Sequence, residues 1–276
     1  MATAGPARAP LPPSGHAGSF AAMFGLDPHL VLLAATATLV AGLVKGAIGF
    51  AMPMILMSAL GSFLPAPVAL ALSILPMLVT NVQQATRQGI GAAMTSVRAF
   101  RWHIGALVLF IFVSAPFARI LPQPVMYLAL GVPILGFALW QLSGRPMALP
   151  VHHHRRAEIL SGVVGGLYGG ISGIWGPPLI VYLLSIGVSK LDQIRVQGVV
   201  FLVGAVALAL AHLGSGVLNA QTLPLSALMV VPAVIGMQMG FWLQDRLDLA
   251  QFRRWTLLLL ALTSLNLIRR GIEVMG

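Results

Sequence analysis

The chain has 276 residues, of which 58% are hydrophobic and 8% are charged, whereas about 25% of the residues of an ordinary soluble domain are charged. With a mean hydropathy of +0.93 and a mass of 29.0 kDa, it has too little polar surface for a water-soluble globule. The composition therefore excludes soluble enzymes and disordered proteins and predicts a membrane protein. The net charge of +10 does not indicate nucleic acid as a partner, because the basic residues lie in short segments between apolar runs.

Residues 1–28 are rich in proline, lack the pattern of a signal peptide and are predicted to form a flexible tail. The apolar segments that follow must be helical, because unpaired backbone groups are too costly in lipid. Six of them have the length of one crossing, about 20 residues. They are 66–86, 103–121, 124–142, 196–213, 222–243 and 254–271. The fold class is therefore an all-α polytopic membrane protein.

Two further apolar runs do not fit a simple crossing. Residues 29–62 and 159–188 comprise 34 and 30 residues, which is too long for one straight crossing and too short for two with a turn. Glycine and proline lie in the middle of each run, which indicates either a re-entrant hairpin or a broken helix.

The distribution of Lys and Arg favours hairpins, because cytoplasmic loops are enriched in basic residues. If all eight segments cross, the basic residues divide 9 to 6 between the two sides. If both long runs return to the side from which they entered, the division is 11 to 4, with Lys45 inside the membrane. The cytoplasmic group then contains Arg87, Arg98, Arg101, Arg145, Arg155, Arg156, Lys190, Arg195, Arg246, Arg253 and Arg254.

The two long runs also resemble each other. Gly42, Gly46, Gly49 and Pro53 correspond to Gly166, Gly170, Gly173 and Pro177 at a constant offset of 124 residues. Each half is then a broken or re-entrant hairpin followed by three crossings, and the halves are inverted in topology, as in many secondary transporters. The predicted organisation is a tail (1–28), a first transmembrane repeat (29–142), a basic cytoplasmic linker (143–158) and a second repeat (159–272).

These glycines have two possible roles. Glycines four residues apart allow helices to approach closely, and we expect only this packing role of Gly236 and Gly240. A half-helix that begins near Pro53 or Pro177 would also point free N–H groups and a positive dipole end at the membrane midplane, which suits an anion.

The sequence resembles the TauE/SafE family through its G-x-x-x-G-x-x-G-x-x-x-P pattern, which occurs in both halves, and through Gly236-x-x-x-Gly240 before a last helix. The resemblance implies a multi-pass permease of the bacterial inner membrane that exports a small sulfur-containing anion such as sulfite or sulfoacetate, and a homodimer. The family tends to have Gly-x-Gly-Gly-Gly before the proline, whereas this chain has Gly49-Phe50-Ala51-Met52-Pro53 and Gly173-Ile174-Trp175-Gly176-Pro177.

Lys45 is the clearest candidate for a substrate contact, because it lies deep in an apolar run and no Asp or Glu lies inside any predicted span. Its expected partner is a bound anion or a backbone carbonyl, and a snorkelling structural lysine is the alternative. Arg195 either binds an anion through its planar guanidinium or marks the cytoplasmic interface. The full candidate set is Lys45, Gly46, Gly49, Ser73, Asn81, Gln84, Gly170, Gly173, Trp175, Arg195 and Gln197.

The lack of carboxylates within the spans also bears on mechanism. Proton-coupled transporters use relays of Asp, Glu or His in the membrane, and only His212 is a candidate here. The sequence therefore favours export driven by the substrate gradient and the membrane potential, without a cofactor.

Two other functions stay open. An anion channel has the same sequence features as a carrier, and Ser172 with His212 matches the residue types of an intramembrane serine protease. The consecutive His152, His153 and His154 lack the spacing of metal ligands, so a solvated loop next to anionic lipid is the favoured interpretation.

Overall fold

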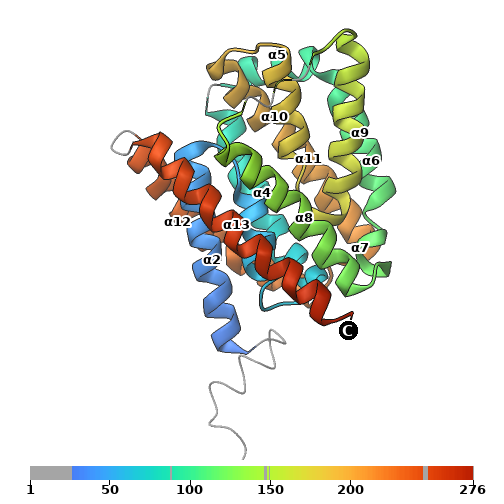
Figure 1. The fold of residues 1–276 in the computed structure, drawn as a ribbon, viewed down its shortest axis with the longest axis vertical. Helices are drawn as coiled ribbons and strands as arrows, with labels where there is room; N and C mark the ends of the chain where they lie inside the picture. The colour runs from blue at the N-terminus through green and yellow to red at the C-terminus, as the bar shows by residue number, and fades with distance from the viewer. Residues whose placement is uncertain (1–26, 88, 146–147, 149, 245–247, 276) are drawn as a thin grey trace, which may run out of the picture.

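A computed structural model describes residues 27–87, 89–145, 148, 150–244 and 248–275 (Figure 1). These residues form helices and connecting segments without a β-strand. The predicted all-α polytopic class is confirmed, because six helices in the described part of the chain are long and apolar enough to cross a membrane. The predicted tail lies outside the described residues up to position 26.

The helices follow one another in a simple order (Figure 1). The first half of the chain contains α2 (Pro28–Ile48), α3 (Met52–Leu60), α4 (Ala66–Thr86), α5 (Ile90–Ala99), α6 (Arg101–Ser114), α7 (Phe117–Ile120) and α8 (Gln123–Leu142). The second half contains α9 (His154–Ser172), α10 (Gly176–Ser185), α11 (Lys190–Ser215), α12 (Thr222–Gln244) and α13 (Leu249–Glu273).

Five of the six predicted single crossings correspond to long apolar helices, namely α4, α6 together with α7, α8, α11 and α12. The sixth long apolar helix is α2, which has the length of a crossing by itself. The predicted crossing at 254–271 forms a helix, α13, but does not belong to this group. The reason is that Arg253 and Arg254 at its start and Arg269 and Arg270 near its end shorten its apolar stretch.

Each long run consists of a long helix, a short break and a second helix of about half the length. The first break separates α2 from α3, and the second separates α9 from α10. At the far end of α3, Arg270 near the C-terminus of α13 donates to the carbonyl of Gly61. The chain therefore returns after the break towards the lower end in Figure 1, where α2 begins. α10 likewise returns towards the start of α9, so both runs have the form of a hairpin.

The long helices pair through their glycines. A Cβ atom on Gly42 or Gly46 of α2 would lie 2.3 Å or 2.2 Å from a backbone carbonyl oxygen of α12. One on Gly166 or Gly170 of α9 would lie 2.6 Å from a carbonyl oxygen of α6. α4 likewise contacts α11, and α8 contacts α13. Two repeats related by the 124-residue offset would give these same pairs of helices. The repeat boundaries themselves stay a prediction.

The predicted packing role of two further glycines agrees with this arrangement. A Cβ on Gly236 would lie 2.1 Å from the carbonyl oxygen of Leu39, and one on Gly240 would lie 2.2 Å from that of Leu43. Because backbone cannot yield as a flexible side chain does, these positions require glycine for the close crossing of α2 and α12.

α9 begins at His154, inside the segment that the sequence analysis assigned to a linker at 143–158. His154, Arg155 and Arg156 are exposed in its first turn. Glu158 is buried, and its carboxylate accepts hydrogen bonds of 3.1 Å from the backbone N–H groups of Trp102 and His103 at the start of α6. This carboxylate occupies the positive end of α6, an interaction that favours helix at these positions.

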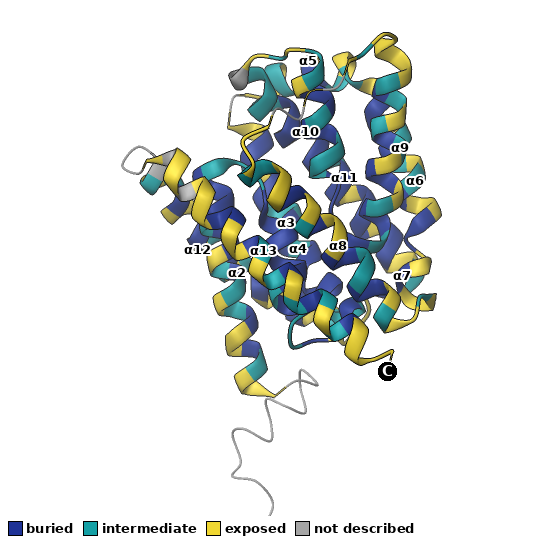
Figure 2. Cartoon of the chain, in the orientation of Figure 1, coloured by how far each residue is buried: buried dark blue, intermediate teal, exposed yellow. Residues whose placement is uncertain are grey.

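The buried residues lie at the centre of the bundle, on α3, α4, α10 and α11, while the outer helices expose apolar side chains (Figure 2). Leu262 of α13 is 67% exposed and Leu160 of α9 is 63% exposed. A surface of this kind suits contact with lipid tails, so these outer faces are the ones that we expect to meet the membrane.

Candidate functional site

The two helix breaks meet at one internal cavity. Lys45, Phe50, Ala51, Pro53 and Met54 line it from the first half of the chain, with Asn81 of α4. Ile174, Trp175, Gly176, Pro177 and Phe201 line it from the second half. Its volume is about 20 Å³, which is the room that a single water molecule needs. The structure thus shows this cavity closed.

The breaks have matching backbone geometry. Gly49 ends α2 and Gly173 ends α9, both in the left-handed conformation with φ of +83° and +71°. Each glycine N–H donates a 2.7 Å hydrogen bond to the carbonyl four residues earlier. Ala51 also has a positive φ, +76°, and it is the one non-glycine residue with this conformation in the described part of the chain. Such strain typically collects at functional sites.

Two helix N-termini line the cavity. α3 begins at Met52 and α10 at Gly176, and each has a proline, Pro53 or Pro177, in its first positions. The residues before them, Ala51 and Trp175, provide no side-chain hydrogen bond to cap the helix. The positive dipole ends of α3 and α10 therefore come together at this point, which favours an anion. Because Pro177 and Pro178 have no N–H, Gly176 is the one backbone donor among the first three residues of α10.

Lys45 is 2% exposed and provides a cation at the cavity. Its Nζ donates a 3.0 Å hydrogen bond to Oγ1 of Thr80 and a second bond to Oδ1 of Asn81, both on α4. Two neutral side chains therefore hold Lys45, and the sequence analysis named neither as its partner, because a sequence does not show which face of α4 meets α2. An anion as a further partner of Lys45 stays a prediction.

Lys45 also lines a second cavity, of about 40 Å³, together with Gly46, Gly49 and Gln84. The Nε2 of Gln84 donates a 3.0 Å hydrogen bond to the carbonyl oxygen of Gly49. At the other side of this cavity lies exposed Arg87, whose guanidinium carbon is 4.3 Å from the ring centre of Phe241. No Asp or Glu is among the described residues that line either cavity. Lys45 thus lies between the two spaces.

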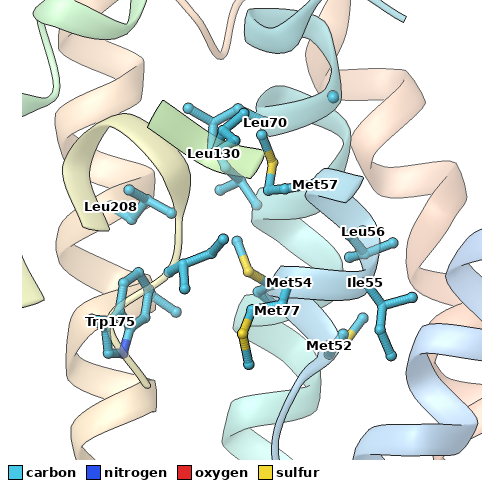
Figure 3. Close-up of a cluster of buried hydrophobic side chains, with 14 of the residues drawn as sticks. Met52, Met54, Ile55, Leu56, Met57, Leu70, Met77, Leu130, Trp175 and Leu208 are labelled. Carbon is cyan, nitrogen blue, oxygen red and sulfur yellow. The ribbon is translucent and has the colours of Figure 1, made fainter. Parts of the chain in front are cut away.

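Trp175 is wedged between two helices. A Cβ on Gly169 of α9 would lie 2.9 Å from its ring, and one on Gly204 of α11 would lie 2.7 Å from it. The ring of Phe201 packs edge-on at a centroid distance of 6.5 Å. Figure 3 shows Trp175 beside the methionines of α3 and α4, including Met54 and Met77. These two glycines therefore hold the wall of the cavity in place.

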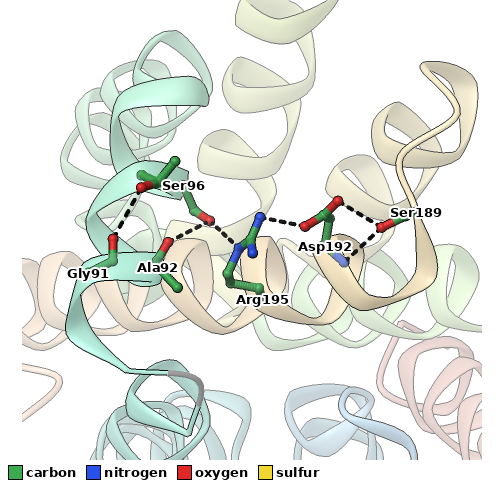
Figure 4. A network of polar contacts seen from close by, with 7 residues as sticks. Gly91, Ala92, Ser96, Ser189, Asp192 and Arg195 are labelled. Carbon is green, nitrogen blue, oxygen red and sulfur yellow. Dashed lines mark hydrogen bonds and ion pairs between the residues drawn. The ribbon is translucent and has the colours of Figure 1, made fainter.

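Arg195 does not reach the cavity. Its Nε donates to Oγ of Ser96 at 3.1 Å, and its Nη2 pairs with the carboxylate of Asp192 at 2.5 Å (Figure 4). Asp192 also accepts a hydrogen bond from Ser189, the N-cap of α11. The interface interpretation of Arg195 is the one that agrees with this network. The sequence placed Arg195 near the start of its helix but could not indicate the direction of its side chain.

Four other candidates also line neither of the two cavities. Ser73 is buried and donates to the carbonyl of Leu70 at 2.7 Å. Gly170 packs against α6, and Gln197 is buried without lining either space. Gly173 forms the second break without lining the cavity. The candidates that the structure brings together are Lys45, Gly46, Gly49, Asn81, Gln84 and Trp175.

Ser172 and His212 do not form a catalytic pair. The hydroxyl of Ser172 donates to the carbonyl of Tyr168 at 2.6 Å and accepts from the N–H of Ile174 at 3.0 Å. His212 contacts the carbonyl of Gly170 at 2.8 Å and the hydroxyl of Ser215 at 3.1 Å. Nucleophilic catalysis needs a hydrogen bond between the serine and its base, so the protease interpretation lacks its geometry.

The sequence analysis missed several residues at the cavities. Phe50 and Met54 adjoin the break, so proximity to Gly49 and Pro53 was an available signal. Thr80, which accepts a hydrogen bond from Lys45, shares a helix face with Ser73 and Gln84; the spacing indicated a polar stripe there, but the candidate set left Thr80 out. Arg87 follows Gln84 by three residues, so the same spacing was an available signal for it. Phe201 is brought to the cavity by the packing of α11 against α4 and α10.

The comparison with known families agrees with this architecture. The family model described as sulfite exporter TauE/SafE matches residues 34–267. The chain belongs to the TauE/SafE family. As a TauE/SafE protein it is a multi-pass membrane permease of the sulfite and organosulfonate exporter type. No curated protein and no solved structure matches it.

Proposed function

We propose that this TauE/SafE protein exports a small sulfur-containing anion, such as sulfite or sulfoacetate, and binds it at the Lys45 cavity. The observation that carries the proposal is the convergence of three positive groups on one buried space. They are the ammonium of Lys45 and the N-termini of α3 and α10. Each of these groups favours an anion, and no described carboxylate lines the space to neutralise them.

The size of the cavity supports alternating access. A volume of about 20 Å³ is too small for an anion of four or more heavy atoms, so the substrate requires the breaks to open. α3 and α10 are half-length helices with one end at the cavity, and each is joined to its long helix through a left-handed glycine. We propose that they move between two arrangements, each of which exposes Lys45 to one side of the membrane.

Arg87 and the second cavity mark the proposed entry. The end of the bundle that carries Arg87 belongs to the basic, predicted cytoplasmic group, and Lys45 lines the space that leads from it. An anion that enters beside Arg87 would next meet Lys45. Outward movement of one negative charge gains about 2.3 kcal/mol per 100 mV of inside-negative potential. Export then needs no proton relay.

Three further parts of the proposal come from the family resemblance and the charge distribution. We place the protein in a bacterial inner membrane, with the basic end in the cytoplasm. We propose a homodimer as the assembled form. We also propose that the chain is a carrier and not an enzyme, since Ser172 and His212 are both hydrogen-bonded elsewhere.

Thermal unfolding of the purified protein with added anions tests the site. We expect sulfite, sulfoacetate, thiosulfate, taurine or a simple carboxylate to raise the unfolding midpoint of the parent protein. Lys45→Met, which keeps an unbranched side chain one atom shorter and removes its charge, should abolish that rise. Arg195→Gln serves as the matched control and should retain it. Equal stabilisation of the parent and Lys45→Met would show that the anion binds elsewhere.

Flux measurements in sealed vesicles test the mechanism. We expect export of the stabilising anion to saturate with concentration and to slow when the membrane potential is collapsed. Flux that depends on a proton gradient and ignores the potential would contradict the proposed driving force. Unitary currents in planar bilayers would identify an anion channel in place of a carrier.

A further inference from the structure

A groove between α9 and α10 opens on the outer surface of the bundle and has no role in the transport proposal. Its volume is about 650 Å³. Leu160 and Val164 of α9 and Pro178 and Val181 of α10 form its walls. Leu160 and Val164 are 63% and 47% exposed. The groove is therefore an apolar, membrane-facing space that the described part of the chain leaves unfilled.

The mouth of the groove is basic. His152, His153 and Arg156 line it at the start of α9, and all three are exposed. No Asp or Glu is among the described residues that line it. Next to it, the guanidinium carbon of Arg155 lies 4.1 Å from the ring centre of Trp102, which is 40% exposed. Exposed Trp with basic neighbours is typical of the membrane interface, so the basic rim lies at the level of lipid headgroups.

We propose that this groove binds an anionic phospholipid of the leaflet at the basic end of the bundle. Its phosphate contacts His152, His153 and Arg156, and one acyl chain lies between α9 and α10. From Arg156 to Val164 the helix rises about 12 Å at 1.5 Å per residue, so the apolar walls continue from headgroup level into the hydrocarbon region. Basic pockets between transmembrane helices on the cytoplasmic side bind lipids of this class.

Other occupants fit the groove less well. A small soluble anion would use the basic rim and leave the apolar walls empty. A second copy of the chain, related by a twofold axis, would place this basic rim close to its own counterpart, and like charges repel. A phospholipid matches both the charge of the rim and the apolar walls.

The groove shares one residue with the transport site. Pro177 lines both the groove and the Lys45 cavity, so a bound lipid would contact the start of α10. The proposal of a lipid site does not depend on which anion is transported, and its test requires no transport measurement.

Native mass spectrometry and thermal unfolding of the full chain in a neutral detergent provide the test. The probes are dioleoyl phosphatidylglycerol and dioleoyl phosphatidylcholine, which share acyl chains and differ in net charge. We expect phosphatidylglycerol to bind the parent protein more tightly than phosphatidylcholine does and to raise its unfolding midpoint further. Replacing His152, His153 and Arg156 together by Gln should remove this preference, and loss of the Arg156 charge by itself should lower the affinity about fivefold. Leu160→Trp, which fills the groove, should weaken the binding of both lipids.

Two matched variants control for general effects. Arg254→Gln removes an exposed charge from α13, and Leu262→Trp adds bulk to an exposed lipid-facing position there. Both should bind as the parent does. Equal binding of the two lipids by the parent would overturn the proposal, as would a triple variant that keeps the preference. Stabilisation by glycerol phosphate equal to that by phosphatidylglycerol would show that the groove walls are not used.

Discussion

Asn81 accepts a hydrogen bond from the ammonium of Lys45 and donates one of 2.9 Å from its Nδ2 to the carbonyl oxygen of Phe201. It thereby links α2, α4 and α11 at the cavity. The ammonium of Lys45 donates to two neutral oxygens, those of Thr80 and Asn81. No described carboxylate lines the cavity, so a bound anion would bring the negative charge that Lys45 lacks there.

Asn81→Asp should weaken anion binding, because it places a carboxylate where we propose that the substrate binds. We expect the affinity for the stabilising anion to fall on the order of 100-fold, because opposed like charges cost several kcal/mol. Asn81→Leu removes both hydrogen bonds without adding charge and should lower stability by about 1–3 kcal/mol, with much of the anion affinity kept. Isothermal titration of both variants separates the two effects. Equal affinities for the two would argue against an electrostatic role of Lys45.

Ala51→Gly should stabilise the protein, because Ala51 adopts a left-handed conformation with φ of +76°. In this region a residue with a Cβ destabilises the folded protein by roughly 1–2 kcal/mol. Glycine removes that strain, but its unfolded chain has more conformational freedom, which cancels part of the gain. We expect a net gain of about 1 kcal/mol in chemical unfolding. The reverse change at the same break, Gly49→Ala, should cost a similar amount. Its Cβ would have room, with the nearest heavy atom, Nε2 of Gln84, at 3.9 Å. Loss of stability in Ala51→Gly would mean that the methyl group matters more than the backbone strain.

Gly46→Ala should force α2 away from α12, because the added Cβ would lie 2.2 Å from the carbonyl oxygen of Met237. We expect a loss of about 1–3 kcal/mol, as for other overpacked positions. Gly136→Ala is the control: Gly136 is also in a helix, with no atom within 4 Å of an added Cβ. That variant should be neutral or more stable by up to about 1 kcal/mol. If both variants behaved alike in thermal unfolding, the close approach of the two helices would not contribute to stability.

Ser172→Ala distinguishes a structural serine from a nucleophile. The change leaves the N–H of Ile174 without its 3.0 Å acceptor, which should lower stability by about 1–3 kcal/mol. Anion flux per folded molecule should stay at the parent level, since the hydroxyl does not line the cavity. A peptide-cleaving activity in the parent that Ser172→Ala removes would restore the protease interpretation.

The helix breaks could be predicted because their cause is local. Gly49 and Gly173 stand before Pro53 and Pro177 in both halves, and left-handed caps followed by proline in the first helical turn end one helix and begin the next. Trp175 lies within the second of these breaks, and Lys45 was identified for another local reason, its position deep in an apolar run.

The remaining site residues depend on contacts between distant segments. Arg195 was ambiguous because one of its two partners, Ser96, lies on α5, 99 residues away in the sequence. The burial of Glu158 was not predicted, since the N–H groups that bind it belong to α6 and lie 55 and 56 residues away. Helix spacing indicates which residues share a face, but it does not indicate which face meets a neighbour.

The wedged position of Trp175 makes the site visible to spectroscopy. Of the five tryptophans, Trp175 is 2% exposed, whereas Trp102, Trp140, Trp242 and Trp255 are 40–65% exposed. A variant in which those four are Phe would emit from the cavity wall alone. Its fluorescence would then record the opening and closing of the site in real time, without an attached dye.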